Sequence, residues 1–125
     1  MFSTEDDSKM KKKMIPDLRF AIAINSDLSE YEIVTVLKDI LQTANSISAI
    51  ALKHDVNMIV VYENSLFDFT KVHDEVDWLY YKHELSVFPL EDSTLLYQRD
   101  FANTLLIKIR ECGFLAERIC DDDFL

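Results

Sequence analysis

A regular alternation of large apolar and smaller residues runs from position 18 to position 24. Large apolar side chains occupy every second position of this stretch, which is the period of a β-strand. The turn-forming residues Asn25, Ser26 and Asp27 follow directly. The pattern therefore predicts a first strand that ends at this turn.

The stretch after the turn has the spacing of an amphipathic helix. Ser29 and Glu32 fit a capping box, in which the Ser29 hydroxyl accepts from the third helical amide and Glu32 reaches back to the amide of Ser29. We expect this helix to end near Asn45 and Ser46. The apolar positions that recur on one face are Ile33, Val34, Leu37, Ile40, Leu41 and Ala44.

Two apolar runs rich in β-branched residues come next, at residues 47–52 and 58–62. Turn residues between them predict an antiparallel hairpin. Uninterrupted apolar runs are typical of central strands. Residues 64–77 mix partial helical spacing with acidic side chains, so we expect either a short helix or an ordered loop there.

The alternation of side chains along residues 78–88 predicts another strand. Pro89 cannot donate a hydrogen bond to a neighbouring strand, so the strand should end there. The side with more apolar character should face the core, and it holds Leu79, Tyr81, His83, Leu85 and Val87.

The last third of the chain reads as a helix followed by a strand. Asp92 or Ser93 is expected to cap the helix, and Gly113 follows it, where many helices need a residue that tolerates positive φ. Residues 114–120 then form the last strand. The apolar stripe of the helix holds Leu95, Phe101, Ala102, Leu105, Leu106, Ile109 and Cys112.

The assembled order is β-α-β-β-(α)-β-α-β. This order predicts an α+β two-layer sandwich, with a mixed or antiparallel five-stranded sheet and two main helices on one face. Right-handed crossovers are expected where the helices join parallel strands. Residues 1–16 are expected to form a flexible charged tail and residues 17–125 a single domain.

The formal net charge of −10, from 23 acidic and 13 basic residues, narrows the range of partners. Four of the basic residues are lysines of the first thirteen positions, so the folded body repels phosphate. We therefore expect neither a nucleic-acid nor a membrane partner, whereas a basic protein would be attracted. Solubility alone is the competing explanation of the acidity. No apolar stretch resembles a signal peptide or a membrane span, so we expect a cytoplasmic protein.

Candidate catalytic chemistry is sparse. Each histidine precedes an acid, as in His54-Asp55, but adjacent residues of a strand point to opposite sides and do not form a metal site together. Cys112 and Cys120 are expected to be structural, and a single glycine excludes a glycine-rich phosphate loop. We expect no catalytic residue, no metal and no cofactor.

The run 77–89, followed by a helix and then by Cys120-Asp121-Asp122-Asp123-Phe124-Leu125, resembles a pattern in small acidic bacterial proteins. Some proteins of this kind are immunity proteins of polymorphic-toxin loci. The resemblance covers about the last 50 residues. It implies a stoichiometric binder that occludes a toxin's active site or clamps the toxin inactive. Separately, we expect a monomer or a homodimer.

Aromatic and acidic residues fit such a binding surface, because aromatic side chains supply contact area and carboxylates complement a basic nuclease groove. Alternatively, the two aromatic residues of this set, Trp78 and Tyr80, belong to a second layer of the core. The candidate partner-binding residues are Asp68, Asp74, Glu75, Asp77, Trp78, Tyr80, Asp121, Asp122 and Asp123.

Two other classes of function remain open. The order β-α-β-β-α-β is also that of ferredoxin-like modules that sense small molecules or regulate other proteins. An enzyme would be indicated by a concave pocket that holds two of His54, His73 and His83, or one of them with a cysteine.

Overall fold

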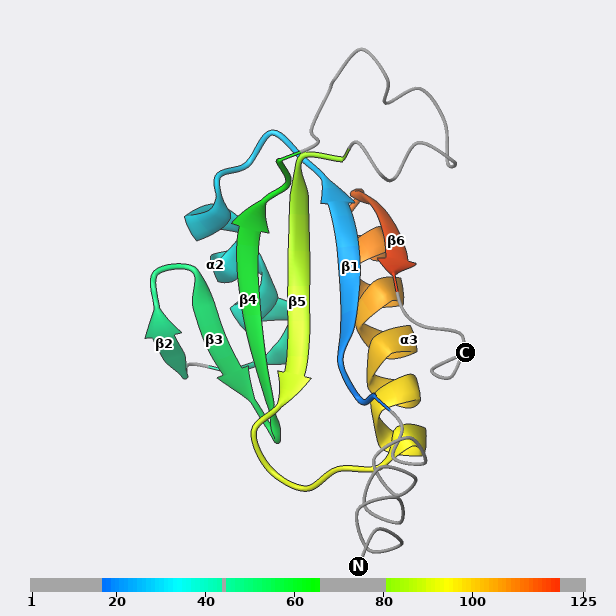
Figure 1. Cartoon of the computed structure of the whole chain (residues 1–125). Helices are drawn as coiled ribbons and strands as arrows, with labels where there is room; N and C mark the ends of the chain where they lie inside the picture. The colour runs from blue at the N-terminus through cyan, green and yellow to red at the C-terminus, as the bar shows by residue number, and fades with distance from the viewer. Residues whose placement is uncertain (1–16, 44, 66–80, 120–125) are drawn as a thin grey trace, which may run out of the picture.

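The computed structural model describes residues 17–43, 45–65 and 81–119. Two helices and six strands follow one another along these residues (Figure 1). Their order is β1 (Phe20–Asn25), α2 (Glu30–Leu41), β2 (Ser46–Ser48), β3 (Ala51–His54), β4 (Asn57–Glu63), β5 (His83–Pro89), α3 (Leu95–Glu111) and β6 (Leu115–Ile119). The tail predicted for residues 1–16 lies outside the described residues.

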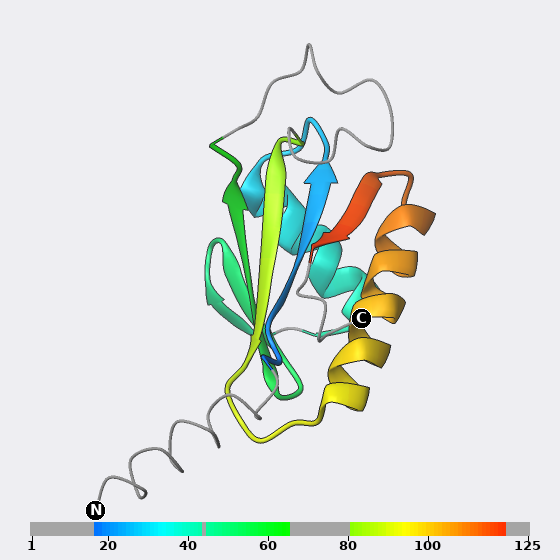
Figure 2. The same cartoon turned by 45° about the vertical axis from the view of Figure 1, so that its right-hand side comes forward.

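All six strands form one antiparallel sheet in the order β2-β3-β4-β5-β1-β6. Both helices lie on the same face of this sheet, as Figures 1 and 2 show. The α+β class is confirmed, but the expectation of five strands is wrong. A turn at Ala49 and Ile50 divides the predicted strand 47–52 into parts of β2 and β3.

The connections form two interleaved β-α-β units. β1 and β4 run parallel with β5 between them, and β5 and β6 run parallel with β1 between them. Each helix crosses behind the sheet in the right-handed sense (Figure 1). The β2–β3 hairpin is inserted between α2 and β4, so it forms an outer edge of the sheet.

Helix α2 begins as predicted and ends earlier than predicted. The capping box of Ser29 and Glu32 is present in both directions. The helix ends at Leu41 because Gln42 takes a left-handed conformation with φ 54° and its amide donates back to Asp39. The hydroxyl of Thr43 then donates to the carbonyl of Lys53 on β3, which directs the chain toward the sheet.

Helix α3 is capped by Thr94 and not by Asp92 or Ser93. The Thr94 hydroxyl accepts a hydrogen bond of 3.0 Å from the amide of Tyr97. At the other end Gly113 has φ 94°, as expected of a residue that follows a helix. Cys112 was expected in the core but is exposed, because the buried stripe of the helix ends at Ile109.

The core lies between the sheet and the two helices. Side chains of the central strands that point toward the helices are almost fully buried, and the inward faces of α2 and α3 cover them. The predicted core side of β5 is confirmed for its described members. The main buried apolar residues are Phe20, Ile22, Ile24, Ile33, Val34, Leu37, Leu52, Ile59, Val61, Leu85, Val87, Phe101, Ala102, Leu105 and Ile109.

A buried pair of amides joins α3 to the start of β4. Asn57 and Gln98 are both fully buried and exchange two hydrogen bonds of 2.9 Å. Gln98 also donates to the carbonyl of Leu18 and accepts from the hydroxyl of Ser93. The pair thus fixes the first turns of α3 against the sheet.

Replacement of Gln98 by Leu is expected to lower the free energy of unfolding by about 2 kcal/mol, because it leaves the buried amide of Asn57 unpaired. Chemical denaturation followed by circular dichroism measures the loss. Adding Asn57→Leu should recover part of it, since removing both partners leaves no unpaired amide. Fully additive losses in the double variant would contradict this view of the pair.

Neither helix in the described part of the chain has both the length and the apolar character needed to cross a lipid bilayer.

Candidate functional site

Within residues 17–43, 45–65 and 81–119, no helix lies on one face of the sheet (Figure 1). Successive residues of a strand point to opposite sides, so the neighbours of the buried side chains on β1, β4 and β5 point away from the helices. We call the surface that they form the open face; in Figure 1 it faces the viewer. It includes Ala21 and Ala23 on β1, Met58, Val60 and Tyr62 on β4, Glu84, Ser86 and Phe88 on β5, and Glu117 on β6.

The strand register fixes the pattern of the open face. Val60, Ser86 and Ala21 lie side by side across its centre, so only small or medium side chains stand there. Met58 pairs with Phe88 toward one end of the strands. Most of these side chains are half-buried, which leaves part of their apolar area accessible.

Two carboxylates lie on one side of this apolar centre, because the register sets Glu84 and Glu117 on either side of Ala23 in the next row across the strands. The Tyr62 hydroxyl donates to Glu84, and burial raises the pKa of the Glu84 carboxyl. Glu117 forms an ion pair of 2.9 Å with Arg110, which reaches it from the end of α3. The open face therefore combines apolar contact area with carboxylate groups, of which Glu117 is paired with Arg110.

A substitution at Glu84 tests the electrostatics of the open face. Because the folded state raises its pKa, Glu84 contributes most to stability below its ordinary pKa of 4.5, and this contribution is lost as the pH rises through the raised value. Relative to Glu84→Gln, the wild-type protein should lose stability as the pH rises from below 4.5 through the raised pKa of Glu84. Urea denaturation across this range measures the difference. Parallel pH profiles of the two proteins would contradict the assignment.

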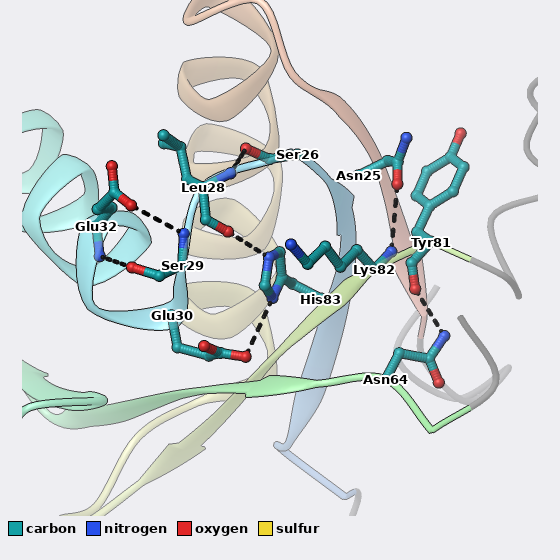
Figure 3. Close-up of polar contacts among 10 residues, drawn as sticks. All are labelled: Asn25, Ser26, Leu28, Ser29, Glu30, Glu32, Asn64, Tyr81, Lys82 and His83. Atoms are coloured by element: carbon teal, nitrogen blue, oxygen red, sulfur yellow. Dashed lines mark hydrogen bonds and ion pairs between the residues drawn. The ribbon is translucent and has the colours of Figure 1, made fainter. Parts of the chain in front are cut away.

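A polar cluster lies at the end of the sheet where β1 ends and α2 begins (Figure 3). At its centre the fully buried His83 places Nε2 2.8 Å from the carbonyl oxygen of Leu28. Since a carbonyl only accepts, Nε2 carries the proton. Nδ1 lacks a hydrogen-bond partner among the described residues and lies 3.7 Å from a carboxylate oxygen of Glu30. His83 thus anchors α2 to β5 and offers no exposed atom to a substrate.

The same cluster fixes the chain on both sides of residues 66–80. Asn64 donates through its side chain to the carbonyl of Tyr81 and through its amide to that of Lys82, both at 2.8 Å. The side chain of Asn25 accepts from the amide of Lys82 (Figure 3). These contacts connect the ends of β4 and β5 beside the end of β1.

The candidate partner-binding residues predicted from sequence lie outside the described residues. Asp68, Asp74, Glu75, Asp77, Trp78 and Tyr80 belong to the stretch between Ser65 and Tyr81. Asp121, Asp122 and Asp123 follow β6. Their role therefore stays a prediction.

The described histidines do not share a site. His54 stacks on Phe101 with ring centroids 5.4 Å apart, beside a hollow of about 280 Å³ lined also by Lys108. The register places His54 and His83 at opposite ends of the sheet. Within residues 17–43, 45–65 and 81–119, no group of three His, Cys, Asp or Glu side chains is arranged to hold a metal ion. His73 and Cys120 lie outside these ranges.

The sequence analysis did not identify the open face. One pattern argued against it and another argued for it. The apolar run 58–62 indicates a strand covered on both faces, whereas Met58, Val60 and Tyr62 point to the open face, on which no helix of the described residues lies. The alternation of side chains along β5 indicated the open face better, because Glu84 and Ser86 fall on the less apolar side of that strand.

No known protein family, characterised protein or solved structure matches the chain.

Proposed function

We propose that this chain is a non-enzymatic protein-binding domain that neutralises a basic toxin, such as a nuclease, in the manner of an immunity protein. The observation that carries the proposal is the open face of the sheet. Apolar side chains of β4 and β5 keep accessible area there, and the carboxylates of Glu84 and Glu117 lie beside them. An apolar centre with a polar rim is the common composition of a protein interface.

The side chains of the open face suit a protein partner. Tyr62 is 38% exposed, and aromatic side chains supply much of the energy of protein interfaces. Met58 adds a flexible side chain that adapts to a partner's shape. The small side chains of Ser86 and Ala21 let a partner approach the strands closely.

Charge supports a basic partner. The net charge of −10 attracts a cationic protein over a distance and accelerates the encounter at low ionic strength. Asp121, Asp122 and Asp123, predicted from sequence to bind the partner, supply three of the acidic residues behind this net charge. A basic nuclease groove is complementary to such a surface.

Calorimetric titration with the purified product of the gene next to the one that encodes this chain, as the candidate toxin, tests the proposal. We expect a 1:1 complex whose affinity falls as salt is added, because salt screens attraction between opposite charges. Inhibition of that protein's toxic activity at the same stoichiometry would support neutralisation. Lack of binding at micromolar concentrations would count heavily against the proposal.

A ferredoxin-like module that senses a small molecule is the second candidate. The two interleaved β-α-β units favour it, as does the hollow between α2 and α3 beside His54. A panel of free amino acids and nucleotides in a thermal-shift assay distinguishes the two candidates. A rise in melting temperature that depends on ligand concentration would support the sensor, and a flat response to the whole panel would oppose it.

A further inference from the structure

The outer strand β2 is unusual for its lack of charge. It lies within residues 40–52, the longest run without a charged side chain in a chain of which 29% is charged. All three of its residues are exposed. Ile47 is 51% exposed, and Ile50 in the turn that follows is 37% exposed. Natural sheets protect such an edge with charged residues, short strands or bulges, and β2 lacks the charged residues.

The opposite edge of the described sheet has this protection. Strand β6 contains Glu117 and Arg118 within five residues. The side chain of Arg110 donates from Nε to the carbonyl of Ala116 at 3.0 Å, so it occupies a backbone acceptor of this strand. The two edges of the sheet therefore differ in their readiness to accept another strand.

We propose that β2 is a homodimerisation edge, at which it pairs antiparallel with β2 of a second copy. The strand reads Ser46-Ile47-Ser48 in both directions. A two-fold axis perpendicular to the sheet would set Ile47 against the partner's Ile47 and Ser46 opposite the partner's Ser48. The edge is therefore complementary to itself.

Charge also favours a second copy at this edge over a basic partner. Two copies that each carry −10 repel one another, and the repulsion is least where neither surface bears charge. A cationic partner would gain no attraction from the uncharged edge. In the dimer both open faces lie on the same side of the extended sheet. The edge contact leaves both of these faces exposed, so the edge and the open face bind independently.

The contact is short. The register between β2 and β3 shifts at Ile47, and the strand has only three residues. A bulge of this kind bends the strand and limits the length of a ladder. We therefore expect a weak dimer whose population depends on protein concentration.

Sedimentation velocity of the full chain over a range of concentrations tests the proposal. The average mass should rise from one copy to two, and added salt should favour the dimer because it screens repulsion between like charges. Ile47→Asp should raise the dimer Kd by about thirtyfold, since two carboxylates would then face each other across the axis. Ile107→Asp is the matched control, because Ile107 is 56% exposed on α3 and the net charge changes equally.

A monomer at every concentration would overturn the proposal. So would a dimer that Ile47→Asp and Ile107→Asp weaken equally, because the contact would then lie elsewhere. Ser46→Lys serves as a second variant if Ile47→Asp does not fold, and it should weaken the dimer as well. Failure of dimerisation leaves the 1:1 titration with the toxin unchanged, so the two proposals fail separately.

Discussion

Replacement of Leu85 by Ala is expected to lower the free energy of unfolding by about 3 to 4 kcal/mol. Leu85 is fully buried near the middle of β5. The register places it between Ile22 on β1 and Val61 on β4, which are also fully buried. Removal of its side chain therefore leaves a cavity in the centre of the core, in addition to the lost transfer free energy.

Urea denaturation monitored by circular dichroism measures this loss. Leu96→Ala is the matched control, because Leu96 is 70% exposed on α3. We expect it to change the free energy of unfolding by less than about 0.5 kcal/mol. Similar losses in the two variants would mean that the core does not lie between the sheet and the helices as described.

Replacement of Ser86 by Lys is expected to weaken binding to the basic toxin about a hundredfold. Ser86 lies in the centre of the open face between Val60 and Ala21. A lysine there places a cation and a long side chain where we expect a cationic partner to dock. Calorimetric titration with the neighbouring gene product measures the change in affinity.

The matched control for this substitution is Thr104→Lys. It also replaces a small hydroxyl side chain by lysine and changes the net charge equally, but Thr104 is exposed on α3. We expect it to reduce the affinity less than about threefold, through the overall charge alone. Equal effects of the two variants would show that charge, and not the open face, determines binding. Thermal melting checks that both variants are folded.

Local signals in the sequence predicted most of the elements. The period of two in β1 and β5, the capping box at Ser29 and the glycine after α3 each depend on residues that are close in the chain. Such signals need no knowledge of the tertiary fold. They were therefore sufficient for the α+β class and for the order of the main elements.

The missed boundaries depend on residues without a strong local preference. The turn that separates β2 from β3 is Ala49-Ile50, which lacks the usual turn residues, and the Ser48 hydroxyl accepts from the amide of Ile50 to close it. Gln42 adopts a left-handed conformation that glycine or asparagine would have signalled.

Contacts between distant residues were beyond the reach of the sequence pattern. Gln98 is buried because Asn57, on a strand far away in the chain, satisfies its amide. The order of strands is equally non-local, and the open face follows from that order together with the placement of both helices on one side. Sequence alternation alone does not say which side of a strand a helix will cover.

Carbon-13 methyl NMR of the chain, free and saturated with the neighbouring gene product, tests most directly whether the open face binds a protein. We expect the methyl signals of Met58 and Val60 to shift, because both point to the open face. The methyl signals of Leu96 and Ile107, which are exposed on α3, should stay unchanged. Shifts confined to α3, with Met58 and Val60 unaffected, would contradict the proposal that this protein binds its partner through the open face of its sheet.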